Sequence, residues 1–140
     1  MPEDFSKNLI KEYRHWKIYI NANQSYLGRC VVWCKRADAL DLADAAPEEQ
    51  QELFLVLHDL REASRKVFQA DWFNYLFLGN AVPHLHGHFL PRYKKPKKFM
   101  GITFSDKLFG QYPDDSDNNQ LMVPEEVLWS IKDMLAEALK

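Results

Sequence analysis

Apolar and polar residues alternate along two short segments in the first quarter of the chain. The first, Trp16–Asn21, alternates large apolar with polar side chains, and the second, Arg29–Cys34, is also rich in strand-forming residues. Turn-forming residues lie between them, and Gly28 closes the connection. Two such segments joined by a short turn predict an antiparallel β-hairpin.

Two other segments repeat their apolar residues at helical spacing. The first begins at Pro47-Glu48-Glu49, which suits a helix N-terminus because proline fits the first turn and carboxylates favour the positive end of the helix dipole. It is predicted to run to about Gln69, with a buried face made of Leu53, Phe54, Val56, Leu57, Leu60, Ala63, Val67 and Phe68. The second is predicted over residues 124–140, with Val127, Leu128, Ile131, Leu135 and Leu139 as its apolar stripe.

Further strand-like sequence lies between the two helices. Phe73–Leu78 is rich in β-formers, Gly79-Asn80 interrupts it, and a second strand is predicted over His84–Tyr93. Residues 94–123 carry proline, glycine, aspartate and asparagine and predict an irregular loop. The order of elements favours an α+β fold with a mainly antiparallel sheet of about five strands, a central helix and a C-terminal helix.

Composition narrows the class of protein. With 140 residues, 46% of them hydrophobic and 27% charged, the chain predicts one globular domain over residues 1–140. A net charge of −2 argues against nucleic acid as a partner. No apolar run approaches the roughly 20 residues that span a bilayer, so no membrane association is expected. The acidic start lacks the features of a signal peptide, and the two cysteines cannot form a disulfide framework, which predicts a cytoplasmic location.

Three of the five histidines stand at alternate positions, as His84, His86 and His88. On a β-strand such residues share one face, with neighbours roughly 7 Å apart. Three interpretations stay open from the residues alone. One imidazole attacks phosphorus while another handles protons, or the histidines bind zinc, or they are structural.

A zinc site needs a further ligand or a bound water. The remaining histidines, His15 and His58, form no recognisable second half of a metal motif. We therefore predict no metal and no cofactor, and a zinc-dependent hydrolase stays an alternative.

The segment from His84 to Leu90 resembles the signature of the histidine triad family of nucleotide hydrolases and transferases, which is His-x-His-x-His followed by two apolar residues. The resemblance covers about residues 10–95, with the helix from Pro47 matching the central helix of the family. Family members commonly form homodimers through this helix and the strand that follows it, so the resemblance implies a homodimer.

The resemblance also implies roles for the three histidines. His86 would attack the α-phosphorus of a nucleotide substrate, such as a dinucleoside polyphosphate or a nucleoside phosphoramidate. The second ring nitrogen of His86 would be held by a carbonyl, expected to be that of His84. His88 would contact a phosphate or bridging oxygen near the leaving group. The chemistry requires no metal in the family.

Four further residues match substrate-binding positions of the family. Asn21 stands where a residue contacts the ribose hydroxyls, and Asn74 falls about where an amide lies near the phosphates. Arg29 occupies the place of the usual fourth histidine, and Asn80 that of a glutamine. Arginine binds phosphate but cannot exchange protons.

The sequence departs from the family pattern at two further positions. Ala81 supplies no hydroxyl where serine or threonine is usual, and Gly87 replaces a large apolar residue, which leaves space for a bulky neighbour from the helix. A nucleotide-binding module with little or no catalysis therefore stays an alternative to the enzyme.

Overall fold

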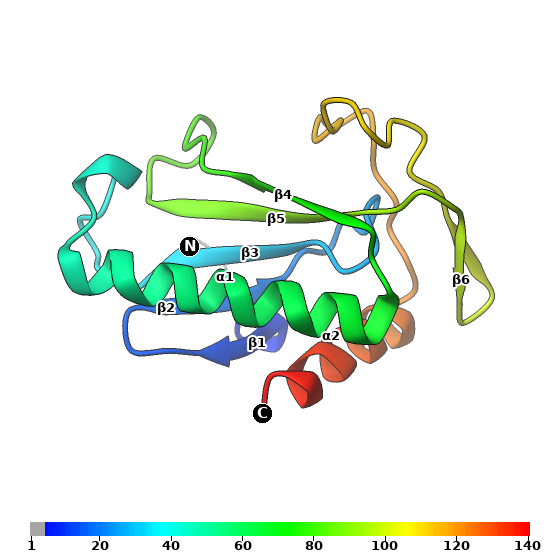
Figure 1. Ribbon diagram of the computed structural model, residues 1–140, viewed down its shortest axis with the longest axis horizontal. Helices are drawn as coiled ribbons and strands as arrows, with labels where there is room; N and C mark the ends of the chain where they lie inside the picture. Colours follow the sequence, from blue (N-terminus) through cyan, green and yellow to red (C-terminus); the bar gives the residue numbers. More distant parts are fainter. Residues whose placement is uncertain (1–4) are drawn as a thin grey trace.

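The computed structural model describes residues 5–140 and confirms the α+β class (Figure 1). An antiparallel sheet has the strand order β1-β2-β3-β5-β4. Its strands are β1 (Leu9–Glu12), β2 (Trp16–Ile20), β3 (Cys30–Cys34), β4 (Trp72–Leu76) and β5 (His86–Arg92). The helices are α1 (Pro47–Phe68) and α2 (Glu125–Ala138), with short 3-10 turns at Ser6–Asn8 and Leu42–Asp44. No helix within residues 5–140 is long and apolar enough to cross a bilayer.

The predicted hairpin is present as β2 and β3. The pairing runs without a break from Trp16 opposite Cys34 to Ile20 opposite Cys30. Along both strands every second residue is buried and the residues between are partly exposed. This alternation is the physical result of the sequence pattern, because successive side chains of a strand point to opposite faces.

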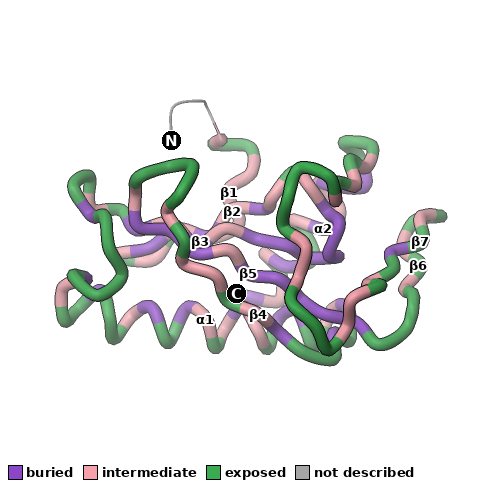
Figure 2. The backbone as a smooth tube through the Cα atoms, turned by 90° about the horizontal axis from the view of Figure 1, so that it is seen from above, coloured by how far each residue is buried: buried purple, intermediate pink, exposed green. Residues whose placement is uncertain are grey.

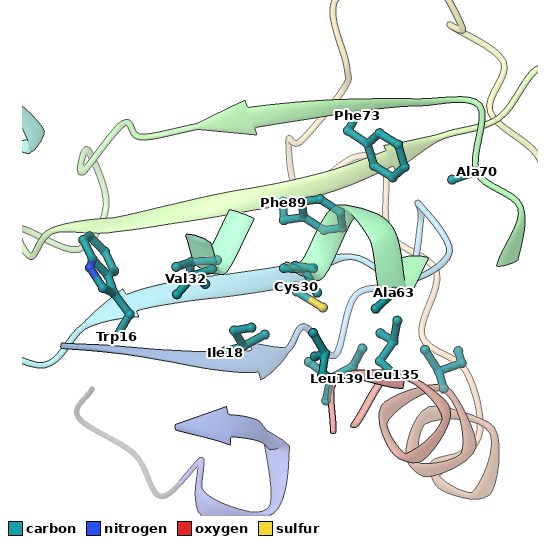
Figure 3. Close-up of a cluster of buried hydrophobic side chains, with 14 of the residues drawn as sticks. Trp16, Ile18, Cys30, Val32, Ala63, Ala70, Phe73, Phe89, Leu135 and Leu139 are labelled. Carbon is teal, nitrogen blue, oxygen red and sulfur yellow. The ribbon is translucent and has the colours of Figure 1, made fainter. Parts of the chain in front are cut away.

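The core lies between the helices and one face of the sheet (Figures 2 and 3). The sheet contributes Ile18, Val32 and Phe89, which are all fully or almost fully buried. The apolar stripe predicted for α2 is buried throughout, at Val127, Leu128, Ile131, Leu135 and Leu139.

The start of α1 is anchored by the buried residue Glu49. Its carboxylate accepts hydrogen bonds from the Ala46 amide at 2.8 Å and from Arg36 Nε at 3.0 Å. The hydrogen bond from Arg36 lowers the pKa of Glu49. The indole of Trp16 donates to the Glu49 carbonyl at 2.9 Å, so the same residue ties α1 to β2.

The buried face of α1 is narrower than the sequence pattern predicts. Phe54, which we expected to be buried, is 74% exposed. Successive helical residues are turned by about 100°, so Phe54 points away when its neighbour Leu53 faces the sheet. Phe54 lies instead beside an apolar groove formed with β4.

The structure differs from the sequence prediction in two further places. Residues 94–123 contain a hairpin of β6 (Lys97–Phe99) and β7 (Ile102–Phe104), where a wholly irregular loop was expected. Its turn, Met100-Gly101, has both residues at positive φ, which is the backbone that a two-residue hairpin requires. The histidine strand begins at His86, so His84 precedes the strand.

Gly87 makes room for an aromatic ring. A Cβ atom at Gly87 would lie 2.5 Å from the ring of Phe77, which is much closer than van der Waals contact. The bulky neighbour expected at this glycine therefore exists, but it follows β4 and does not belong to the helix.

Gly87→Val should lower the free energy of unfolding by about 1–3 kcal/mol, because the added side chain must displace the ring of Phe77. Urea denaturation of the variant measures this. In a Phe77→Ala background the same substitution should cost less. An equal loss in both backgrounds would show that the ring is not the obstacle.

Candidate active site

The pairing of β3 with β5 sets the positions of the histidines. His86 lies opposite Trp33, and His88 lies opposite Val31. The intervening residues of both strands, such as Val32 and Phe89, are buried in the core beneath the helices. The two histidines therefore point to the other side of the sheet, which we call the histidine face.

His86 is held in one orientation by the main chain. Its Nδ1 lies 2.7 Å from the His84 carbonyl oxygen, which is the contact expected from the sequence. A carbonyl only accepts hydrogen bonds, so Nδ1 carries the hydrogen and Nε2 keeps its electron pair. The ring is 8% exposed and lies between Trp33, at a centroid distance of 5.5 Å, and His88, at 5.2 Å. Nε2 is therefore equipped to act as a nucleophile.

The imidazole of His84 is tied to β3 and does not extend the strand. Its Nε2 lies 2.7 Å from the Cys34 carbonyl oxygen, and its ring stacks on Trp33 at a centroid distance of 4.1 Å. His84 therefore acts on His86 through its main-chain carbonyl, while its side chain fixes the segment that carries this carbonyl.

His88 is held neutral by its surroundings. Burial, with the positive charge of Arg29 and the neighbouring His86 as further causes, lowers the pKa of His88 to about 4, against a smaller opposing effect of Asp115. Its Nδ1 is buried and has no hydrogen-bond partner among the described residues. At neutral pH this imidazole is therefore uncharged and has a free polar atom.

Arg29 lies just before β3 and is 5% exposed. Its main chain is fixed, since its amide donates to the Tyr26 carbonyl at 2.9 Å and its carbonyl accepts from Asn21 and Gln24. Burial lowers the pKa of the guanidinium. Its Nε and Nη1 atoms are buried without a hydrogen-bond partner within residues 5–140.

The three asparagines predicted to bind substrate have different surroundings. Asn21 directly follows β2, and its Oδ1 accepts from the Asn23 amide at 2.9 Å. Asn74 lies opposite Leu90 on the histidine face. Asn80 is exposed in the loop before His84 and is not among the residues that line the cavity beside His86. The structure therefore gives Asn80 the weakest link to the site.

Asn74 is held by Arg92, at the end of β5. Its Oδ1 accepts from Arg92 Nη1 at 2.6 Å. Arg92 also pairs with Asp106, at 2.7 Å, and both side chains are almost fully buried. Asp106 stands 14 residues away in the sequence, and no local pattern marks it.

Trp33 was also missed as a site residue. The sequence pattern does not mark it as part of the site, yet it stacks on His84 and adjoins His86. The signal that could have found it is the strand alternation, because Trp33 has the opposite parity to the buried residues Val32 and Cys34.

Two cavities lie near these elements. One of about 350 Å³ adjoins His84 and His86 and is bounded by the segments 40–42 and 77–79. A larger one, of about 800 Å³, lies between α1 and β4 and contains none of the three histidines. The smaller cavity adjoins His86, but His88, Arg29 and Asn74 are not among the residues that line it.

No group of three or more histidine, cysteine, aspartate or glutamate side chains in the described part of the chain could hold a metal ion. Both cysteines are free and buried, and burial raises the pKa of each. The zinc alternative therefore lacks a set of ligands there.

A protein-family model described as the HIT domain matches residues 6–95. The chain belongs to the HIT domain family. The bis(5'-adenosyl)-triphosphatase of Saccharomyces cerevisiae is 30% identical over an alignment of 117 residues, which covers 76% of this chain and 56% of the yeast protein. The chain thus spans about half the length of the curated relatives it matches.

Solved structures of histidine triad proteins share the fold. One from Bradyrhizobium japonicum superposes with a TM-score of 0.76 at 18% identity, covering 96% of this chain and 93% of the other. One from Marinobacter aquaeolei gives 0.74 at 21% identity, with 96% and 91% covered. The HIT fold therefore extends over nearly the whole chain, beyond the region that the family model matches.

The low pKa of His88 makes stability depend on pH in a definite direction. The folded state holds this pKa near 4, whereas the ordinary value is 6.5, so the unfolded state binds the proton first as the pH falls. The free energy of unfolding should therefore decrease from pH 7 to pH 5, by about 1–2 kcal/mol from this group. Urea denaturation at both pH values measures the change. His88→Gln should remove this part of the decrease, and a variant that keeps it would contradict the assignment to His88.

Proposed function

We propose that this HIT protein is a nucleotide hydrolase or nucleotidyl transferase that cleaves a nucleoside phosphate substrate at the α-phosphorus. The candidate substrates are dinucleoside polyphosphates and nucleoside phosphoramidates. The observation that carries the proposal is the hydrogen bond from His86 Nδ1 to the His84 carbonyl, because it leaves Nε2 with a free electron pair. The 30% identity to a bis(5'-adenosyl)-triphosphatase supports a nucleotide substrate.

The proposed reaction has two steps on His86. First, Nε2 forms a bond to the α-phosphorus, and the bond from phosphorus to the leaving group breaks. In the second step water attacks the phosphorus of the nucleotidyl-histidine and releases a proton. The electron pair of the phosphorus–nitrogen bond returns to Nε2, and the nucleoside monophosphate is free.

The other residues of the site would bind the substrate. His88, with its unpaired Nδ1, and Arg29, with its unpaired Nε and Nη1, would contact phosphate oxygens. Asn74, oriented by Arg92, would contact the same phosphates, and Asn21 would contact the ribose. Asn80 is retained as a further phosphate contact, supported by the resemblance alone. A cytoplasmic location remains a prediction from the sequence.

His86→Asn should reduce kcat for hydrolysis of diadenosine triphosphate by about 1,000-fold or more, because asparagine cannot form the covalent intermediate. Release of adenosine monophosphate measures the rate, and thermal unfolding verifies that the variant folds. His15→Asn, a histidine outside the site, should retain full activity.

Turnover that survives in His86→Asn would overturn the nucleophile. A wild-type protein that binds adenine nucleotides but releases no product after long incubation would favour the alternative of a binding module.

The exposed residues of α1 and β4 support a homodimer. β4 is at the edge of the sheet, and Phe54, Leu55 and Trp72 are 74%, 54% and 64% exposed. Phe54 lines the groove of about 800 Å³ between α1 and β4, and all three side chains belong to α1 or β4. A second copy that pairs its own β4 and α1 against them would bury this apolar surface and extend the sheet across the molecule.

The wild-type protein should have a solution mass of twice 16.5 kDa by light scattering. Phe54→Glu should shift it to a monomer, because burying the new carboxylate is costly. Met134→Glu, on the outer side of α2, is the control and should stay dimeric. A monomeric wild type would contradict the proposal.

A further inference from the structure

Two buried arginines extend onto the histidine face and have opposite surroundings. Each nitrogen of the Arg92 guanidinium donates at least one hydrogen bond. It pairs with the Asp106 carboxylate and donates to Asn74 and to the carbonyls of Leu108 and Gln111. Arg29 is 5% exposed, and its Nε and Nη1 atoms have no partner. The ion pairs formed by residues 5–140 do not include Arg29.

The strand register brings Arg29 to His88. Cys30 pairs with Phe89 and Val31 with His88, so Arg29 and Val31 are on the same face as the histidines. Diagonal neighbours on adjacent strands are about 7–8 Å apart at the main chain, which is within reach of an arginine side chain. The charge of Arg29 helps to lower the pKa of His88, and Asp115, an exposed residue, acts on the pKa of both groups in the raising direction. A buried cation that lacks a paired carboxylate is prepared to receive an anion.

We propose that Arg29 makes this site selective for substrates whose leaving group departs as a phosphate anion. The inference rests on the proposed function and narrows it. It assigns phosphoric anhydrides, such as dinucleoside polyphosphates, as the substrate class, in preference to phosphoramidates.

The chemistry of the leaving group supports this choice. When Nε2 of His86 bonds to the α-phosphorus of an anhydride, the bond from phosphorus to the bridging oxygen breaks. That oxygen keeps the electron pair and becomes a terminal phosphate oxygen, so the step needs no proton. Arg29 would stabilise the new negative charge through two donors.

Cleavage of a phosphoramidate requires a proton donor for the leaving group. Its nitrogen would leave with the electron pair as an amide ion unless a neighbouring group supplies a proton. Arg29 does not release its proton near neutral pH. His88 is neutral there, because its pKa lies near 4, so it is a poor acid. The site thus stabilises a departing anion far better than it protonates a departing amine.

The test compares two substrates that share the same nucleoside, diadenosine triphosphate and adenosine 5'-phosphoramidate. The ratio of their kcat/KM values in the wild-type protein should favour the anhydride by about 10-fold or more. Arg29→Gln should lower kcat/KM for the anhydride by about 100-fold and have much less effect on the phosphoramidate. Arg14→Gln, which removes an exposed arginine, is the matched control and should change neither value.

The outcomes separate this inference from the proposed function. A wild-type preference for the phosphoramidate, or equal losses on both substrates in Arg29→Gln, would overturn the role of Arg29 while His86 catalysis stands. Failure of the wild type to hydrolyse either substrate would overturn the proposed function itself. The wild-type ratio requires no variant, so it decides the point even where Arg29→Gln does not fold, and Arg29→Lys should restore part of the anhydride activity.

Discussion

The antiparallel register between β3 and β5 is the constraint on which the site depends. It sets His86 beside Trp33 and His88 beside Val31. A slip of one residue would turn both imidazoles into the core and Gly87 onto the other face. The packing of Val32 and Phe89 beneath the helices opposes such a slip, since both are almost fully buried. Hydrophobic contacts on one face of the sheet thus set the positions of His86 and His88 on the other face.

Arg92 and Arg29 are both buried, but within residues 5–140 only the guanidinium of Arg92 is paired with a carboxylate. Removing a partner from a buried ion pair costs about 3–5 kcal/mol, so Arg92 and Asp106 hold the segment after β7 firmly against the sheet. Arg29 has no such partner among the described residues, and its unpaired buried donors are the basis of the role that we propose for it. Local strain or unpaired charge of this kind is typical of functional sites, where the ligand supplies the missing interaction.

Local periodicity was sufficient for most of the fold. Alternation identified β2 and β3, and helical spacing identified α1 and α2, because these patterns follow directly from the geometry of each element. The sequence also identified the histidines and the carbonyl that holds His86. It did not identify Asp106 or Phe77, since the contacts of each depend on residues distant in the chain. It also assigned Phe54 to the buried face of α1, although the turn of the helix exposes it. His84 was placed in the strand by its spacing, yet its ring binds the Cys34 carbonyl and lies outside the pairing.

The group that orients His86 is a main-chain oxygen. No substitution at position 84 removes this carbonyl. What can be lost is the path of the backbone, which the imidazole of His84 holds through Cys34 and Trp33. The orientation of His86 therefore depends on two parts: a main-chain acceptor that no side-chain substitution deletes, and side-chain contacts of His84 that another contact of equal reach could replace.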